Sequence, residues 1–445
     1  MSITHCAALA ALLALTSPQL AAQAAPQLAR PSLATPPKCQ TLYAVDGEIH
    51  GDRFGAAIAT LPDLDGDGQP ELLVGAPNRQ PVGMGTKGHV YVLSGASGAV
   101  LRTHDGWSKG DRLGHAVASL PDLDGDGVPD YGGGAVWAVN IDDPDGPASP
   151  GVVGLWSGAT GAALDPLVGS GTWECFGAAL DALGDIDGDG VGDLLVTARF
   201  GGAPGGDALE APGHVRLLSG ATGATLGQVV GPAAGDCLGY AAITLPDLNG
   251  DGLPDIAAGA WPATEGQGLV EILSGADGAL LGHFDGHAHG ENFGYALAVL
   301  PDLDGDGLAE LAVGAPAASF AAGRVTVLSP ASGQTLFTIE GHVAGQRLGM
   351  AVAAIGDRDG DGITELAIGA PFWSGSMGRV LIVSPPTGTI VAVIAGHVSD
   401  SNFGETLRTV PDLTGDGLDE LAIGAPLSPS ADSDAIGRVV VVSLH

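Results

Sequence analysis

Seven copies of one acidic, nine-residue loop hold most of the reactive side chains of this 445-residue chain. Each copy places oxygen-bearing side chains at positions 1, 3, 5 and 9 and glycine at positions 4 and 6, as in DLDGDGLAE from Asp302. The glycines permit the positive φ angles of a tight curl, which brings the oxygens together. Several hard oxygens in a pliable loop suit Ca²⁺, and the lack of Cys and His in the loops disfavours zinc or copper. The pattern predicts up to seven calcium sites.

Each predicted site uses side-chain oxygens at positions 1, 3 and 5, the backbone carbonyl at position 7 and a closing carboxylate at position 9. In chain order the predicted ligands are Asp63, Asp65, Asp67, Gln69 and Glu71; Asp122, Asp124, Asp126, Val128 and Asp130; Asp185, Asp187, Asp189, Val191 and Asp193; Asp247, Asn249, Asp251, Leu253 and Asp255; Asp302, Asp304, Asp306, Leu308 and Glu310; Asp357, Asp359, Asp361, Ile363 and Glu365; and Asp412, Thr414, Asp416, Leu418 and Glu420.

The loop has two other interpretations, an EF-hand and a turn without an ion. An EF-hand closes with Glu at position 12 between helices, but position 12 of the first copy is Val74, inside the apolar run LLVGAP. The EF-hand is therefore excluded. An acidic turn without an ion remains an alternative, because Asp and Gly favour turns, and it is strongest for the last copy, where Thr414 replaces an acid.

The segments around the loop repeat with it. The copies start 55 to 63 residues apart, and each is preceded by Phe-Gly or Leu-Gly, as at Phe54 and Leu113. Four copies are followed by Gly-Ala-Pro; the second, third and fourth depart from it. A third apolar run, an ASG-like turn and a fourth run complete each repeat. Four short strands per repeat predict an all-β fold, a seven-bladed β-propeller of four-stranded antiparallel blades.

The combination of FG, DxDGDGxxD and GAP at fixed offsets resembles the FG-GAP repeats of the integrin α-subunit headpiece, a seven-bladed calcium-binding propeller. The resemblance covers nearly all of the chain from Thr41 onward. It implies an adhesion or ligand-binding module. Two departures stand out: integrin α propellers resemble this loop only in their later blades, and integrins continue into leg domains and a membrane span.

The two ends of the repeat region predict how the ring closes. The last copy runs only to its third strand, GRVVVVS from Gly437. The segment TLYAVDG from Thr41 aligns with TLFTIEG from Thr335, which is a fourth strand. We therefore expect the amino-terminal strand to complete the last blade, so that residues 39–445 form one propeller without an exposed edge.

The first residues resemble an export signal. The apolar run 7–15 is too short to span a bilayer and is followed by Ala22-Gln23-Ala24, a signal-peptidase-like site, so residues 1–24 are predicted to be a signal peptide. Residues 25–38, rich in Ala and Pro, are predicted to be a disordered lead-in. We expect an exported protein, secreted, at the cell surface or in a periplasm, with no membrane span after the signal.

The net charge of −35 limits the classes of partner that the chain can be expected to bind. The loops hold 26 of the 51 acidic residues, and these would repel one another without bound cations. So acidic a chain disfavours nucleic acid and anionic lipid as partners. The oligomeric state is left open.

The cysteines allow two states. Cys175 and Cys237 occupy the same position in adjacent repeats, directly before the FG-type pair. They form a disulfide if that position lies close to the ring axis, and remain thiols if it lies further out. Cys39 is left over, either free or in an intermolecular bond.

Signals for catalysis are weak. The chain has neither G-x-S-x-G nor H-E-x-x-H, and the glycines from Gly83 to Gly88 precede a strand rather than open a helix. His287, His342 and His397 recur after a glycine between blades, and a polar loop residue is the favoured interpretation over a metal or acid–base site.

The variable segments between the second and third strands are predicted to lie on the face opposite the calcium loops. They contain aromatic residues that we expect to be exposed and to anchor a protein or glycan ligand, namely Trp137, Phe200, Trp261, Phe372 and Trp373. The sequence therefore favours a binding or adhesion module. The alternatives are a calcium-dependent polysaccharide lyase or a hydrolase, which needs Lys, Arg, Tyr or His gathered with a carboxylate on one face, and a structural surface component.

Overall fold

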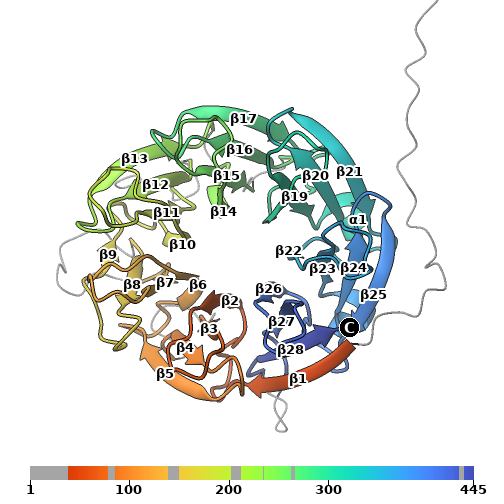
Figure 1. The fold of residues 1–445 in the computed structure, drawn as a ribbon, viewed down its shortest axis with the longest axis horizontal. Helices are drawn as coiled ribbons and strands as arrows, with labels where there is room; N and C mark the ends of the chain where they lie inside the picture. The colour runs from red at the N-terminus through yellow and green to blue at the C-terminus, as the bar shows by residue number, and fades with distance from the viewer. Residues whose placement is uncertain are drawn as a thin grey trace, which may run out of the picture.

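The computed structural model describes residues 39–78, 86–138, 150–201, 212–233, 235–261, 266–429 and 435–445. Within these residues, seven four-stranded antiparallel sheets form a ring around a central opening (Figure 1). The predicted seven-bladed β-propeller is confirmed. The predicted signal peptide and lead-in lie outside the described residues.

The strands of each blade follow one another in sequence order within the sheet, except in the last blade. Blade 1 contains β2 (Ala57–Leu61), β3 (Glu71–Ala76), β4 (His89–Leu93) and β5 (Val100–Asp105); blade 2, β6 (Leu113–Ser119), β7 (Tyr131–Ala135), β8 (Val152–Trp156) and β9 (Leu167–Val168); blade 3, β10 (Phe176–Ala182), β11 (Leu194–Ala198), β12 (His214–Leu218) and β13 (Thr225–Val230); blade 4, β14 (Leu238–Leu245), β15 (Asp255–Ala260), β16 (Leu269–Leu273) and β17 (Leu280–Asp285). Blade 5 contains β18 (Ala296–Leu300), β19 (Glu310–Ala315), β20 (Arg324–Ser329) and β21 (Gln334–Glu340); blade 6, β22 (Val352–Ala354), β23 (Leu366–Ala370), β24 (Arg379–Ser384) and β25 (Thr389–Ala395); blade 7, β26 (Thr406–Val410), β27 (Glu420–Ala425), β28 (Arg438–Leu444) and β1 (Cys39–Asp46).

The hydrophobic core is divided among the junctions between blades. Middle strands such as β3 and β4 are buried along their whole length, whereas the outer strand β5 alternates between exposed and half-buried residues. Adjacent blades cover both faces of the middle strands, which explains their continuous apolar sequences. One core cluster joins Leu73 and Val90 of blade 1 to Leu113 and Val152 of blade 2. Each blade therefore depends on its neighbours for burial.

The FG and GAP glycines meet where blades touch. A Cβ atom on Gly314 would lie 2.1 Å from the carbonyl oxygen of Gly349, the glycine of the next FG-type pair. Only glycine permits so close an approach of two backbones. Blade 3 departs from GAP at Thr197, and there the Thr hydroxyl donates a hydrogen bond of 2.7 Å to the carbonyl of Gly239. The two motifs are thus the two sides of one junction.

The ring closes as the sequence predicted. Strand β1 pairs antiparallel with β28, with Thr41 opposite Val442 and Asp46 opposite Arg438. The pairing begins at Cys39, two residues before the predicted start. The amino-terminal strand therefore supplies the outer strand of blade 7 (Figure 1).

Among the described residues, two single helical turns depart from the all-strand repeat. They are α1 (Ala318–Ala321) and α2 (Trp373–Ser376), both in the connections between second and third strands. Each contains residues with left-handed φ, such as Ser319 and Phe320. Four residues are too few to show helical periodicity in the sequence.

Candidate functional site

The acidic loops join the first and second strands of every blade, as predicted. In the blade 5 loop, the carboxylate of Asp302 accepts hydrogen bonds from the backbone N–H groups of Gly305 and Gly307, at 2.7 and 2.9 Å. Asp304 and Asp306 each accept one from the residue two positions further on. Across the seven loops, both glycines have φ between 77° and 95°. Hydrogen bonds from the loop backbone thus hold the carboxylates at positions 1, 3 and 5 in place.

The closing residue at position 9 is almost fully buried in every loop, but Asp and Glu close it differently. Asp130 accepts from Leu123 N–H within the loop and from Gly158 N–H of the next turn, both at 2.8 Å. Asp193 and Asp255 make the same pair of bonds. Both carboxylate oxygens are therefore satisfied by the backbone wherever Asp closes the loop.

Glutamate leaves an oxygen without a partner in three of the four loops that it closes; in the fourth, Glu71 accepts from Leu64 N–H and Asp65 N–H with its two oxygens. Glu310 accepts from Leu303 N–H at 2.5 Å through Oε2, whereas its buried Oε1 has no hydrogen-bond partner. The Oε1 atoms of Glu365 and Glu420 are buried and unpartnered in the same way. An unpaired buried carboxylate oxygen is costly unless a cation binds it. The loops closed by Glu310, Glu365 and Glu420 therefore fit a metal ion on their own geometry.

Carboxylate oxygens converge in the greatest number in the loops of blades 5 and 6. Candidate ligand atoms of Asp302, Asp304, Asp306 and Glu310 all lie within 4.8 Å of one another, and those of Asp357, Asp359, Asp361 and Glu365 do the same. In three other loops the group has three acids, those at positions 1, 3 and 9, as in Asp122, Asp124 and Asp130. There the position-5 acid of blade 2, Asp126, accepts a hydrogen bond from the Ser157 hydroxyl at 3.2 Å instead.

Burial raises the pKa of the closing glutamates. It raises the pKa of Glu71, Glu310 and Glu365 to about 7, against the opposing effect of their backbone hydrogen bonds. Burial also raises the pKa of Glu420 and of Asp130. A carboxylate that resists ionisation alone is stabilised as an anion by an adjacent cation.

Asn249 and Thr414 break the all-acid pattern at position 3, as the sequence indicates.

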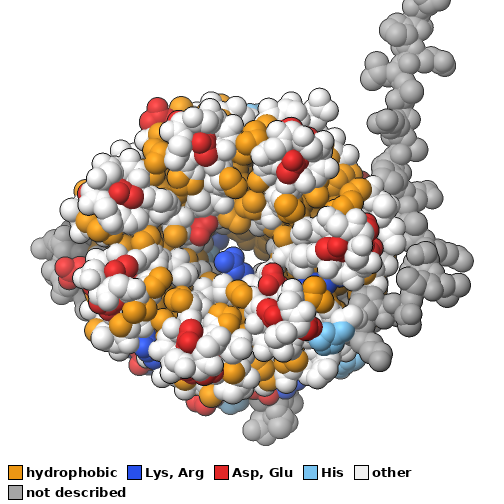
Figure 2. Space-filling model, viewed as in Figure 1, with side chains coloured by type: hydrophobic (Ala, Val, Ile, Leu, Met, Phe, Trp, Pro, Cys, Tyr) orange, Lys and Arg blue, Asp and Glu red, His pale blue; other side chains and the backbone are white. Residues whose placement is uncertain are grey.

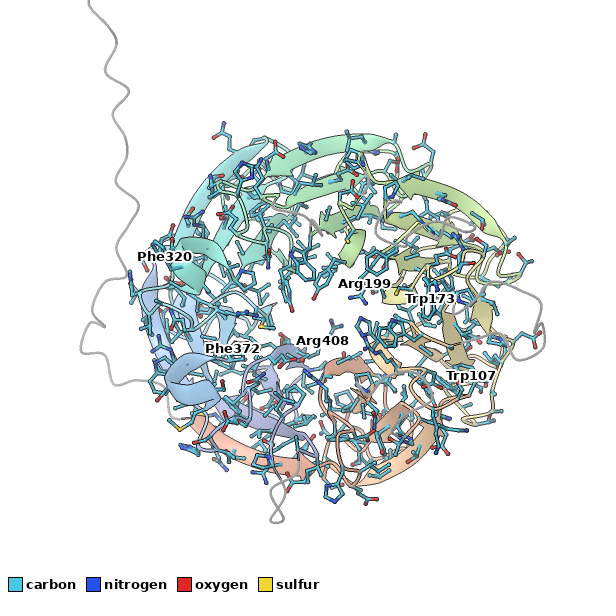
Figure 3. The ribbon with its side chains drawn as sticks, turned by 180° about the vertical axis from the view of Figure 1, so that it is seen from behind. Trp107, Trp173, Arg199, Phe320, Phe372 and Arg408 are labelled. Atoms are coloured by element: carbon cyan, nitrogen blue, oxygen red, sulfur yellow. The ribbon has the colours of Figure 1, made fainter. Side chains whose placement is uncertain are left out.

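Of the variable segments predicted on the opposite face, residues 79–85, 139–149, 202–211, 262–265 and 430–434 lie outside the described residues. The aromatic residues predicted to be exposed there are half-buried. Arginine side chains cover several of them. The guanidinium carbon of Arg112 lies 3.2 Å from the ring centre of Trp137, and that of Arg379 lies 5.1 Å from Trp373. The described residue that is most exposed among the large apolar ones is instead Phe320 of α1, at 95%. Figure 3 shows Phe320 toward the rim and Phe372 nearer the opening.

The ring axis holds a feature that the sequence reasoning missed. A cavity of about 480 Å³ is lined by Arg53, Arg112, Arg199 and Arg347 together with aromatic side chains. Three of these arginines directly precede the FG-type pair, in DRFG, DRLG and QRLG, and have φ near +60°. The recurrence of Arg at this position was the signal in the sequence. Figure 2 shows acidic side chains spread over the blades and basic ones inside the central opening.

A second ring of buried polar side chains was also missed. It lies two residues before each FG-type pair and comprises Asp52, Asp111, Glu174, Asp236, Glu291, Gln346 and Ser401. Asp111 accepts from the backbone N–H groups of Gly88, Ser108 and Leu113. Glu174 contacts both His214 and Arg216. These side chains hold the connection that enters the next blade, so their role is structural.

The cysteines and the loop histidines singled out in the sequence are described by the structure. Cys39, Cys175 and Cys237 are free thiols, so the thiol alternative describes the structure. The side chain of Arg199 hydrogen-bonds the buried Cys175. His287, His342 and His397 are exposed loop residues. Within the residues described, no helix is long and apolar enough to cross a membrane.

A seven-bladed ring with a repeated acidic loop in every blade defines the class of the protein: a β-propeller. The FG-GAP repeat family matches residues 54–93, 293–328 and 403–442. Integrin alpha-8 of Homo sapiens is 30% identical over 219 residues, which are 44% of this chain and 20% of that protein. Integrin alpha-V of Gallus gallus is 28% identical over 208 residues, 42% of this chain and 20% of that protein. The chain therefore contains FG-GAP repeats and forms an integrin α-like propeller, and its matches span about a fifth of the length of these relatives.

Solved structures agree on the fold. The crystal structure of BBS1N in complex with ARL6DN, soaked with mercury, aligns with a TM-score of 0.56 over 92% of this chain and 98% of that chain. The sequence identity is 11%, so the likeness concerns the fold alone.

Proposed function

We propose that this propeller is an exported, calcium-stabilised adhesion module that binds a protein ligand through the face opposite its acidic loops. The observation that supports it is the division between the two faces. One face repeats the same acidic loop in every blade, as a shared structural requirement would. The other differs from blade to blade and presents Phe320, a phenylalanine that is 95% exposed.

Calcium is the proposed ion because the loops offer only oxygen ligands from flexible, glycine-containing turns. In each loop the side chains at positions 1, 3, 5 and 9 would hold the ion, together with the position-7 carbonyl. A bound cation would offset the mutual repulsion of these acids and satisfy the unpartnered oxygens of Glu310, Glu365 and Glu420. Export agrees with this role, since calcium modules outside the cell are filled by millimolar calcium.

Protein is the proposed class of ligand, with glycan as the alternative outcome of the test. The FG-GAP relatives are integrin α subunits, but the aligned part is a fifth of their length, so their partners do not transfer directly. An aromatic side chain held rigidly on a short turn is the kind of anchor that protein interfaces use. Phe320 occupies such a position in α1.

The test is binding of the full chain to a panel of matrix proteins, cell-surface proteins and glycans, measured by surface plasmon resonance. Phe320→Ser is expected to weaken binding to a captured protein at least tenfold. The matched control is Val393→Ser, which removes another exposed apolar side chain on the outer strand β25. Binding that is equally strong in both variants, or confined to glycans, contradicts the proposal.

A second candidate is an acidic-polysaccharide lyase, and the axial cavity favours it. The cavity gathers arginines, Tyr240, Tyr295 and His115 with the carboxylates of Asp400 and Glu405. Such a set contains groups that neutralise a substrate carboxylate and groups that transfer protons. Incubation with polygalacturonate and alginate, followed by ultraviolet detection of unsaturated products, separates this function from adhesion.

A further inference from the structure

Four arginines converge on the axis of a strongly acidic protein. Arg53, Arg112, Arg199 and Arg347 come from four blades and line the same cavity of about 480 Å³. The whole chain has 16 Lys and Arg against 51 Asp and Glu. Further along the opening, Arg408 of β26 lines the space between the inner strands. Figure 3 shows Arg199 and Arg408 at the opening. Five of the 16 basic residues of the chain therefore gather around the ring axis.

Aromatic rings support these arginines. The guanidinium carbon of Arg347 lies 4.7 Å from the ring centre of Phe372, and that of Arg199 lies 5.7 Å from Tyr240. A guanidinium packed against an aromatic face keeps its N–H edge directed sideways, where it can bind a carboxylate through two parallel hydrogen bonds. The buried Nε of Arg199 has no hydrogen-bond partner. At Arg199, one guanidinium donor is therefore left without an acceptor among the described residues.

Acidic side chains of the cavity offset only part of this charge. Glu405 accepts a hydrogen bond of 2.5 Å from Arg53 and is also bound by Asn402. Asp400 is the other carboxylate among the lining residues. Four guanidinium groups against two carboxylates leave the cavity net positive. In the lumen, Asp181 of β10 faces the charge of Arg408.

We propose that the axial cavity binds one carboxylate of a protein partner, an Asp or Glu side chain or a chain end inserted along the ring axis. The proposal deepens the adhesion function and rests on it for the identity of the partner. Cavity size favours a single inserted group over a polymer. The charges of a polyanionic glycan that lie outside the cavity would be repelled by the acidic surface of the protein. A single carboxylate, in contrast, is attracted by the arginines of the cavity.

Specificity for a carboxylate follows from the donors. Tyr240, Trp261 and Tyr295 pack together, with ring centres 4.9 to 6.2 Å apart, and form an apolar wall of the same cavity. Such a wall lowers the local polarity and strengthens the ion pair that forms beside it. A neutral amide of the same shape would leave a guanidinium unpaired, so Asn in place of Asp is expected to bind far more weakly.

The experiment uses the full chain in calcium and a pair of blocked peptides, Ac-Gly-Asp-Gly-NH2 and its Asn counterpart, measured by calorimetry or by the fluorescence of the tryptophans. The Asp peptide is expected to bind at least tenfold more tightly than the Asn peptide. Arg199→Gln combined with Arg347→Gln is expected to abolish that preference. The matched control combines Arg438→Gln with Lys109→Gln, which removes the same charge outside the cavity and is expected to retain it.

Equal binding of the two peptides, or no binding of either, overturns the proposal, as does a preference that survives loss of Arg199 and Arg347. Binding of an oligogalacturonate in the absence of peptide binding overturns the protein partner and assigns the cavity to acidic sugar. The adhesion function is tested separately. If a protein ligand binds the arginine double variant as tightly as the wild type, the adhesion function stands and the axial carboxylate site is overturned. If the Asp peptide binds but no protein ligand is found, the axial site stands and the adhesion function is overturned.

Discussion

Arg438, in the third strand of the last blade, donates two hydrogen bonds to the carboxylate of Asp46 on the first strand of the chain, at 2.5 and 2.8 Å. The two residues also face each other in the β1–β28 register. Residues 392 positions apart are therefore joined at the seam of the ring. Both side chains are partly exposed, so the ion pair itself contributes little, on the order of 0.5 kcal/mol, and the closure depends on the strand pairing around it.

Deletion of residues 41–47 tests the closure. It removes most of β1 and leaves β28 with an unpaired edge, so we expect loss of cooperative unfolding and concentration-dependent aggregation. Light scattering and thermal unfolding measure both. Arg438→Gln is the control, and its melting temperature should stay within a few degrees of the wild-type value. A monomeric deletion variant of normal stability would mean that the ring closes without β1.

Removal of calcium tests the loops together. Chelator is expected to lower the melting temperature by on the order of 10 °C or more, because each site occupied at a hundred times its dissociation constant contributes about 2.7 kcal/mol. Calorimetry with chelator, calcium or magnesium, and metal analysis of the dialysed protein, measure this. Calcium is expected to restore stability better than magnesium, since the loops are pliable. An unchanged melting temperature in chelator would leave the acidic loops as turns without an ion.

The contrast between Glu and Asp at position 9 tests individual loops. Glu310→Gln should remove one calcium from the stoichiometry yet preserve or raise stability in chelator, since a buried charge with an unpartnered oxygen is lost. Asp255→Asn should lower stability with and without calcium, because its amide N–H₂ would face the N–H donors of Leu248 or Gly275. Equilibrium dialysis and unfolding in both conditions distinguish the two. The same response from both variants would refute the distinction.

The pH dependence in chelator follows from the raised pKa values of Glu71, Glu310 and Glu365, each about 7. A carboxyl group whose folded pKa exceeds its unfolded pKa binds more protons when folded, so stability falls as pH rises from the ordinary value near 4.5 through 7. We expect the melting temperature in chelator to decrease between pH 5 and pH 8. In saturating calcium this decrease should vanish. A rise over the same interval would contradict the burial that raises these pKa values.

The sequence predicted the fold well because the repeat constrains it at every level. The loop glycines, the paired glycines at Gly314 and Gly349, and the apolar middle strands are each local requirements that recur in the chain. The axial site was harder to find because its arginines are distant in sequence and only the ring brings them together. Arg53 and Arg347 share a repeat position, but Arg199 follows a different strand. Exposure of the aromatics was mispredicted for a related reason, since the arginines that cover them belong to other segments.

The last prediction separates binding from stability on the variable face. Trp261 packs edge-on against Tyr240, with ring centres 5.0 Å apart, so Trp261→Ala should lower both the melting temperature and ligand affinity. Phe320→Ser should lower affinity at least tenfold while leaving the melting temperature within a degree or two, because a side chain that is 95% exposed loses few contacts. Parallel binding and unfolding measurements on both variants check this. If Phe320→Ser unfolds the ring or leaves affinity unchanged, α1 is not part of the recognition surface.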